Sequence, residues 1–478
     1  MGGNMMKLLK KYLAILLLTA VFAVAGLHLA SRVLTPKGEI EKFYDEPRNS
    51  IDVLVVGSSH SMSGISPVHL YEQTGLTAYN LSTWSQPVWV SYHYILEALK
   101  YQQPQVVVVD VFGAFYDKSY LSGVDVDLVS DDFAASIRPS WNLLRLNLAR
   151  RSAQVTRKTW DEYLNITKYH SRMDRLEWED VAVLFRDDSS TGKGYGPMYV
   201  TESFADYVPA VTDARAELYA PAAVYLQKII DLSREKGFAL VLTKVPYITE
   251  ERDIALLNTV QDICDAQGIP FVDLCRENGA GLDYTADMAD HGHVNYRGAQ
   301  KVTAALGGYL AEMELVPQHA QNVEEAWQQA LATELDSLTV MDIRVTAPAG
   351  EKLAKAAAHG STAMVVLRQG ELTAEQQQTL QTLLEGTVLE PCAQLAPGSC
   401  AVYDGTQLLL GDPAQQWLAQ HAMQVQADET GAPVLQYRGQ SYSHRLTGVN
   451  LLLTDTRTGD IYQSVSYGAE TDFTAYTG

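Results

Sequence analysis

The spacing of apolar positions predicts alternating strands and helices over the first two thirds of the chain. Amphipathic, helix-like stretches separate near-continuous runs of Val, Ile and Leu at residues 51–57, 77–81, 105–112, 238–245 and 270–274. Strands without polar alternation are typical of a sheet that is buried on both faces, and intervening helices join parallel strands. The pattern therefore predicts an α/β domain with a central parallel sheet. Such sheets bind their ligands at the carboxyl ends of the strands.

The alternation breaks between about residues 113 and 213, where loops and amphipathic helices replace the strands. A connection of this length is too long for a plain crossover, and long excursions commonly form lids or binding walls. We therefore assign residues 36–315 to one α/β domain that carries an insertion after its third strand.

The last third of the chain has a different pattern. A polar helix is predicted at 322–338, and residues 316–337 are assigned to a helical linker. Short strands follow, with Asp-Gly, Arg-Gly and Thr-Gly pairs between them, which predicts β-hairpins. Residues 338–478 are therefore expected to form a separate β-rich accessory domain, and no motif in it carries chemistry.

The N-terminal segment is long and apolar enough to predict a membrane anchor within residues 1–35. An uncharged stretch, residues 12–31, follows three lysines and ends at Arg32. Its 20 residues just span a bilayer core at helical rise. Lysines before the stretch favour a cytoplasmic N-terminus, which places the main domains outside the cell. A cleaved signal peptide is the competing interpretation, because Ala23 and Ala25 form an A-x-A site, but apolar residues continue beyond that site.

Composition narrows the class of protein further. A hydrophobic fraction of 47% and a charged fraction of 19% are those of a folded chain. The formal net charge of −21 disfavours nucleic acid as a partner. Four cysteines are too few for a disulfide scaffold, and no C-x-x-C pair indicates zinc. Cys392 and Cys400 either close a small loop in an oxidising space or remain plain thiols.

Candidate chemistry lies at the end of the first predicted strand and in a second segment 231 positions later. Ser59 follows the strand in the sequence VLVVGSSHS, and Asp290 and His293 stand three residues apart in DHGHVNYRGA. This offset puts a carboxylate and an imidazole on the same side of one turn of chain. A hydrolytic triad needs that relation, because the carboxylate fixes the imidazole that takes the proton from a hydroxyl. Either motif alone also fits a plain turn that caps a helix.

The two motifs together, GSSHS after a first strand and D-x-x-H-x-N-x-x-G-A near the end of the α/β domain, resemble the SGNH/GDSL hydrolase superfamily. The closer likeness is to its membrane-anchored DltD-like and AlgJ/AlgX-like branch, and it covers roughly residues 50–312. The resemblance implies a three-layer α/β/α, flavodoxin-like fold. It also implies Ser59 as nucleophile, His293 as base and Asp290 as the acid, with no cofactor.

The same resemblance implies an oxyanion hole, which this sequence alters. Family members build it from the nucleophile's own N–H, a glycine N–H after the second strand and an asparagine side chain after the third. Here Ser82 stands where the glycine is typical, although it still supplies a backbone N–H. The asparagine is missing from VVVVDVFGAFYD, and Gln86 is the candidate substitute amide donor.

We therefore predict an extracytoplasmic, membrane-anchored serine esterase or O-acyltransferase. By resemblance its substrate is acylated cell-envelope polysaccharide and its partner a membrane-bound O-acyltransferase. Metal binding by Asp290, His291 and His293 ranks below the triad, because no ligand spacing elsewhere supports it. One alternative is a catalytically silent protein of the same fold that binds glycan or acts as a scaffold. Another is a structural envelope protein that binds through its C-terminal domain, which weakly resembles an interleukin-like EMT-inducer β-sandwich.

Overall fold

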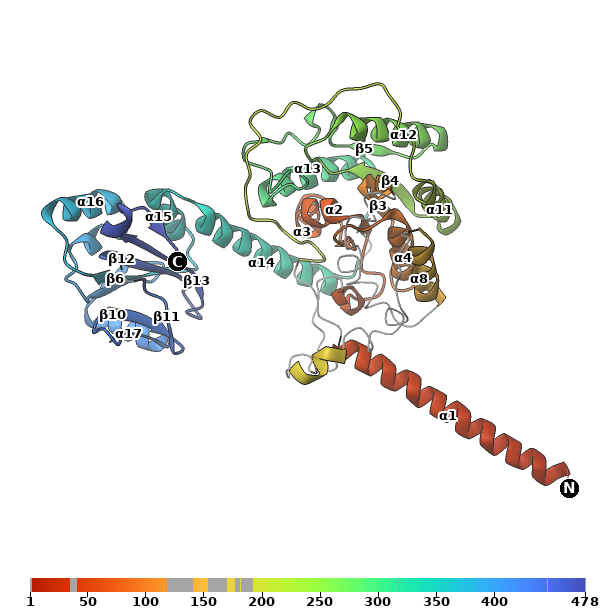
Figure 1. The fold of residues 1–478 in the computed structure, drawn as a ribbon, viewed down its shortest axis with the longest axis horizontal. Coiled ribbons are helices and arrows are strands. Elements are labelled where there is room, and N and C mark those ends of the chain that lie inside the picture. The colour runs from red at the N-terminus through yellow and green to blue at the C-terminus, as the bar shows by residue number, and fades with distance from the viewer. Residues whose placement is uncertain are drawn as a thin grey trace. The chain divides into compact units, whose positions relative to one another are not determined.

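The computed structural model describes residues 2–34, 41–117, 141–153, 170–176, 181, 192–317, 319–444 and 446–477. The chain divides into two compact units, Met1–Glu334 and Leu335–Gly478 (Figure 1). The helix α14 (Gln321–Val345) carries the chain from the first unit into the second. The first unit contains a parallel sheet and the second is built on antiparallel sheets.

The first unit has the predicted parallel sheet at its centre. Its five strands lie in the order β2-β1-β3-β4-β5, and every neighbouring pair is parallel. The order reverses between β1 and β3, and in sheets of this kind ligands bind beside that reversal. The strands are β1 (Val53–Val56), β2 (Ala78–Asn80), β3 (Val106–Asp110), β4 (Ala239–Lys244) and β5 (Phe271–Asp273). This sheet confirms the predicted fold class.

Helices cover both faces of the sheet and complete three layers, as Figure 1 shows. Successive strand residues alternate between two apolar clusters: Leu54 and Val107 belong to one, and Val55 and Val108 to the other. This alternation explains why the strands carry apolar residues at every position. One face is covered by α4 (Val88–Ala98), α11 (Ala220–Lys236) and α12 (Glu251–Gln267), and the other by α3 (Pro67–Thr74) and α13 (Tyr296–Glu312).

The predicted insertion is described only in part, because residues 118–140, 154–169, 177–180 and 182–191 lie outside the described residues. The helix α8 (Trp141–Ala153) packs on α4, where Asn142 Oδ1 lies 2.8 Å from His93 Nδ1. Two short 3-10 helices, η2 (Val111–Ala114) and η4 (His170–Arg175), also belong to this region. From residue 192 the chain returns beside β2 and the site, where the Lys193 carbonyl accepts a hydrogen bond from Asn80 N at 2.9 Å.

The N-terminal segment forms one helix, α1 (Gly2–Leu34). Within it, residues Met5–Leu27 are long and apolar enough to cross a membrane. Large apolar side chains along this span are exposed, among them Leu13 and Leu16 at 65% and 69%. Such exposure is costly in water and is expected of a helix that another phase covers.

The second unit is β-rich, as predicted. Its six-stranded sheet has the order β14-β13-β12-β6-β7-β8, and a three-stranded sheet has the order β11-β10-β9. The Arg-Gly turn between β10 and β11 has positive φ at both residues, 49° at Arg438 and 82° at Gly439, the geometry that two-residue hairpins favour. The strands are β6 (Thr362–Gln369), β7 (Cys400–Tyr403), β8 (Leu408–Leu410), β9 (Met423–Ala427), β10 (Pro433–Tyr437), β11 (Gln440–Ser441), β12 (Gly448–Asp455), β13 (Ile461–Gly468) and β14 (Ala475–Tyr476).

Both faces of the six-stranded sheet are covered. The helices α15 (Ala349–Ala358) and α16 (Ala374–Leu384) and the 3-10 helix η6 (Glu390–Gln394) pack on one face. The helix α17 (Asp412–Gln420) and the three-stranded sheet pack on the other.

All four cysteines are buried and free. Cys392 packs in the cluster on one face of the six-stranded sheet, and Cys400 in the cluster on the opposite face. Burial raises the pKa of the Cys392 thiol to about 12 and that of Cys400 above its ordinary value. Cys392 and Cys400 are therefore plain thiols in the structure and do not close a loop.

Candidate active site

The turn after β1 places Ser59 at the carboxyl edge of the sheet, beside the reversal of strand order. Ser59 is the first residue of α2 (Ser59–Gly64), and Ser58 caps that helix by accepting a hydrogen bond from His60 N. Gly57 makes the turn, because a Cβ there would lie 2.2 Å from Ser61 Oγ and 2.8 Å from Asp110 Cβ. A glycine is therefore needed for β1 to end against β3.

The structure brings Ser59, His293 and Asp290 into one chain of hydrogen bonds. His293 Nε2 lies 2.8 Å from Ser59 Oγ, and His293 Nδ1 lies 2.8 Å and 3.0 Å from the two carboxylate oxygens of Asp290. A carboxylate only accepts, so Nδ1 carries the proton and donates it to Asp290. Nε2 is then left to accept from the serine hydroxyl, the arrangement that a general base requires.

The acid and the base share a tight turn of backbone just before α13. Asp290 Oδ1 accepts hydrogen bonds from Gly292 N at 2.7 Å and from His293 N at 3.0 Å. The three-residue offset is therefore produced by a side-chain-to-backbone turn and not by a helix. The His293 side chain is 17% exposed and that of Asp290 43%, so the carboxylate stays in contact with water.

A buried set of polar groups lies behind Ser59, at the ends of β3 and β4. The Lys244 ammonium lies 3.1 Å from His60 Nδ1 and 3.8 Å from Asp110 Oδ2, and the side chains of Lys244 and Asp110 are fully buried. Asp110 also accepts hydrogen bonds from Val245 N at 2.8 Å and Phe112 N at 3.0 Å. Burial, followed by the nearby Lys244, holds the pKa of His60 well below its ordinary value, so His60 is neutral.

The two predicted oxyanion residues take different places. Ser82 is buried, and its hydroxyl lies 2.9 Å from Ser61 Oγ on the nucleophile's helix, so its segment contacts α2. Gln86 uses both ends of its amide locally: Oε1 accepts from Thr83 Oγ1 at 2.8 Å, and Nε2 donates to Ser91 Oγ on α4 at 2.9 Å. The structure gives Gln86 a local structural role, and its service as an oxyanion donor stays a prediction.

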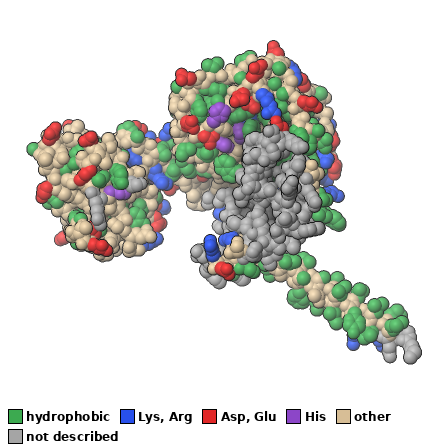
Figure 2. Space-filling model, viewed as in Figure 1, with side chains coloured by type: hydrophobic (Ala, Val, Ile, Leu, Met, Phe, Trp, Pro, Cys, Tyr) green, Lys and Arg blue, Asp and Glu red, His purple; other side chains and the backbone are tan. Residues whose placement is uncertain are grey.

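An aromatic side chain lies at the rim of the site. Trp84 is 39% exposed and its ring meets that of His293 edge-on at 5.5 Å. The chain returning from the insertion borders the site, since Gly196 N donates to Met62 O on α2 and Glu202 N donates to Met288 O. Figure 2 shows histidine side chains gathered on the surface of this unit close to acidic ones.

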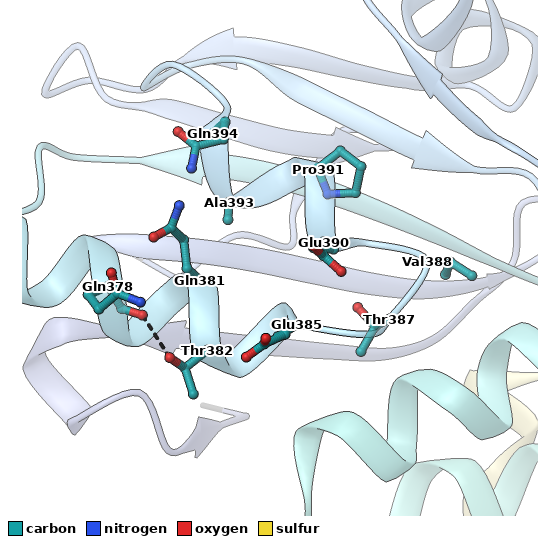
Figure 3. Close-up of a pocket in the computed structure, with 10 residues that line it drawn as sticks. All are labelled: Gln378, Gln381, Thr382, Glu385, Thr387, Val388, Glu390, Pro391, Ala393 and Gln394. Carbon is teal, nitrogen blue, oxygen red and sulfur yellow. Dashed lines mark hydrogen bonds between the residues drawn. The ribbon is translucent and has the colours of Figure 1, made fainter.

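No group of three or more His, Cys, Asp and Glu side chains is placed to hold a metal ion within the part of the chain that the structure describes. A separate hollow of about 640 Å³ lies in the second unit, on the surface of α16 and η6 (Figure 3). Its lining residues carry amides, hydroxyls and carboxylates without a histidine, so this hollow holds no nucleophile–base pair: Gln378, Gln381, Thr382, Glu385, Thr387, Val388, Glu390, Pro391, Ala393 and Gln394.

Sequence reasoning missed the groups behind the serine. Lys244 and Asp110 end two otherwise apolar strands, and a charged residue at the carboxyl end of a buried strand was the available signal. Asn80, at the end of β2, was also missed; its Nδ2 donates to the carbonyls of Ser61, within α2, and of Ile65, directly after it, and so holds the C-terminal half of α2.

Comparisons with known proteins add little to this geometry. No family model matches the chain, and no curated protein matches its sequence. Among solved structures, the chain is similar to a "putative acylhydrolase" from Bacteroides fragilis, with 10% sequence identity and a TM-score of 0.28. The match covers 57% of this chain and 93% of the other. At this level of similarity the match carries no argument about activity, so the functional argument below uses the site itself.

Proposed function

We propose that the first unit is a serine-dependent acyl hydrolase or acyltransferase. The observation that carries the proposal is the chain of hydrogen bonds from Ser59 Oγ through the two ring nitrogens of His293 to Asp290. The three residues come from the two ends of the domain and meet at the carboxyl edge of the sheet, where α/β enzymes bind their substrates.

The proposed reaction is nucleophilic acyl transfer. His293 Nε2 takes the proton from Ser59 as the oxygen attacks the carbonyl carbon of an ester, and a tetrahedral oxyanion forms. The imidazolium then gives the proton to the leaving alkoxide, and an acyl-enzyme remains on Ser59. A water molecule or an acceptor hydroxyl then attacks the acyl-enzyme while His293 takes its proton. The imidazolium returns that proton to Ser59 Oγ, and the acyl group is released. Asp290 keeps the imidazole oriented and stabilises its charged form.

The oxyanion needs donors that are already in place. The backbone N–H of Ser59 and that of Ser82 remain the proposed pair, in keeping with the SGNH resemblance. Ser82 is suited to this because its segment is in contact with the nucleophile's helix. Gln86 is the weaker candidate, since its amide is already hydrogen-bonded to Thr83 and to Ser91 on α4.

The setting of the reaction is proposed from the sequence. If α1 anchors the chain with its lysines inside, the catalytic unit faces the cell envelope. Its substrates would then be acylated envelope polysaccharides, and a membrane-bound O-acyltransferase would be the natural donor of acyl groups. The DltD-like and AlgJ/AlgX-like resemblance favours this assignment.

The test uses the full chain in mild detergent. A fluorophosphonate probe should label the protein, and Ser59→Ala should abolish both labelling and the release of p-nitrophenol from its acetate ester. Ser63→Ala is the matched control, because it removes another buried hydroxyl from the same helix, one that bonds the Ser59 carbonyl at 2.8 Å.

Labelling and turnover that persist unchanged in Ser59→Ala would overturn the proposal. Wild-type protein that neither labels nor turns over, although it is folded, would favour the catalytically silent alternative, in which the same fold binds acylated glycan.

A further inference from the structure

The residue that follows the nucleophile is a histidine with an unusual environment. His60 is only 3% exposed, and its ring stacks on that of Phe112 at 3.7 Å between centroids. Tyr247 meets it edge-on at 4.9 Å, and the His293 ring lies 5.3 Å away. The imidazole is therefore fixed between the start of α2 and the segment after β3, next to the proposed catalytic base.

The tautomer of His60 follows from its neighbour. The ammonium of Lys244 has hydrogen-bond donors only, so the 3.1 Å contact makes His60 Nδ1 the acceptor. The Asp110 carboxylate lies 3.8 Å from the same ammonium. Burial and the Lys244 charge lower the pKa of His60, so the imidazole holds one proton. That proton is on Nε2, which faces away from Lys244.

We infer that His60 Nε2–H is a third donor to the oxyanion and takes the place of the asparagine that this sequence lacks after its third strand. The inference rests on the proposed acyl-transfer function and adds a catalytic residue to it. The ring lies against Phe112, two residues beyond the end of β3, which is the part of the fold where that asparagine would be expected. A neutral imidazole suits this task because its single N–H is far less acidic than that of an imidazolium, so it donates a hydrogen bond without passing its proton to the base.

The buried lysine is explained by the same inference. Burying an ammonium is costly, even beside a carboxylate, so a specific task is a reason for a protein to retain one. Here Lys244 contacts His60 Nδ1, the Val245 carbonyl and the faces of Phe112 and Tyr247. Its effect is to keep the proton of His60 on Nε2, the ring nitrogen that faces away from Lys244. Lys244 is thus a positioning residue that acts through His60.

The experiment measures kcat and KM for p-nitrophenyl acetate on the full chain in detergent. His60→Leu removes the donor from an apolar site of similar size, and kcat should fall about 100-fold or more, with KM within roughly threefold of wild type. His60→Gln returns an amide N–H to about the same place, and its kcat should exceed that of His60→Leu by roughly tenfold. The control is His69→Gln, a buried histidine on α3 that bonds Glu72, and it should leave kcat unchanged.

Two results would overturn the inference: kcat of His60→Leu within threefold of wild type, or kcat of His60→Gln as low as that of His60→Leu. A purely structural role would lower thermal stability and the active fraction together, and rescue by the amide would not occur. If His60→Leu does not fold, Lys244→Met takes over, because Asp110 keeps its two backbone hydrogen bonds there. Without the Lys244 ammonium, His60 is no longer held in one tautomer, so kcat should fall about tenfold at constant KM. An unchanged kcat overturns the inference.

Ser59→Ala, measured alongside, separates the two proposals. If it abolishes turnover while His60→Leu does not slow it, only the donor role of His60 is wrong. If turnover is independent of Ser59, the proposed function is wrong and the donor role falls with it.

Discussion

Replacing Asp290 by asparagine tests the catalytic geometry more sharply than removing the nucleophile. In many serine hydrolases an amide at this position turns the imidazole to the wrong tautomer, because its NH₂ group faces Nδ1. Here the backbone N–H groups of Gly292 and His293 both point at Oδ1. They should hold the amide oxygen of Asp290→Asn at the Oδ1 position, where it still accepts from His293 Nδ1–H at 2.8 Å. A small rotation of the side chain then moves its NH₂ group away from the Oδ2 position, which lies 3.0 Å from the same nitrogen. The correct tautomer should therefore survive.

The expected loss is then mainly that of the negative charge. Two unit charges about 3 Å apart attract by roughly 3 kcal/mol at an effective dielectric constant of about 40, a value between those of a protein surface pair and bulk water. This intermediate value is appropriate because the Asp290 side chain is 43% exposed. About 3 kcal/mol corresponds to a loss of roughly 100-fold in kcat. Asp290→Ala also removes the acceptor for two backbone groups and for the ring, so it should lose at least tenfold more.

The assay is steady-state hydrolysis of p-nitrophenyl acetate by the wild type and both variants, with thermal unfolding as a check on folding. The reasoning is refuted if Asp290→Asn is as inactive as Asp290→Ala, since the amide would then have taken the wrong orientation. It is also refuted if Asp290→Asn has kcat within threefold of wild type, since the carboxylate charge would then contribute nothing.

Three further predictions concern the surroundings of the site. Burial lowers the pKa of His93 to about 4, so the unfolded state takes up a proton at this histidine first as the pH falls. The contribution of neutral His93 to the free energy of unfolding is therefore complete above about pH 6.5 and falls by up to about 3 kcal/mol towards pH 4. Urea unfolding of His93→Gln should show a drop smaller by about this amount, because buried His60 contributes to the pH dependence of both proteins, and equal pH slopes in both would contradict the expectation. Gly194→Ala should destabilise the first unit by at least about 2 kcal/mol in thermal unfolding, because its Cβ would lie 2.0 Å from the Asn80 carbonyl at a φ of +85°. Gly237→Ala, at φ +79° with nothing within 4 Å, is the control for φ alone, and equal losses would rule out the steric argument. Trp84→Ala should raise KM for aryl esters roughly threefold to tenfold at nearly constant kcat, and an unchanged KM would remove Trp84 from the binding rim.

The parallel sheet was predictable because its evidence is local. Each strand carries its own apolar run, and the residues of β3 are apolar at every position before Asp110 because both faces are covered. The pairing of Ser59 with His293 could be proposed for a related reason: both follow strands whose carboxyl ends lie along one edge of the sheet. The shape of the turn at Asp290 could not be predicted, because an offset of three residues fits a helix as well as the turn that the structure has.

The contacts of the polar side chains around the serine were beyond sequence reasoning. Gln86 was chosen as an amide donor for its residue type, but its hydrogen bonds are made to Thr83 in the same loop and to Ser91 on α4. Lys244 reaches His60 across two strand ends, 184 positions along the chain. Which nitrogen of an imidazole carries the proton depends on packing between distant segments, and no spacing of residue types encodes it.

The bond from Asn80 N to the Lys193 carbonyl has a consequence for how this protein can vary. The chain re-enters the fold at a fixed point beside β2, while the nucleophile's helix is held independently by the Asn80 side chain. Changes of length between residues 118 and 191 would thus leave the Ser59 hydroxyl in place, because both contacts lie outside that segment. Homologues with a longer or shorter segment here should therefore keep the same arrangement of Ser59 and His293.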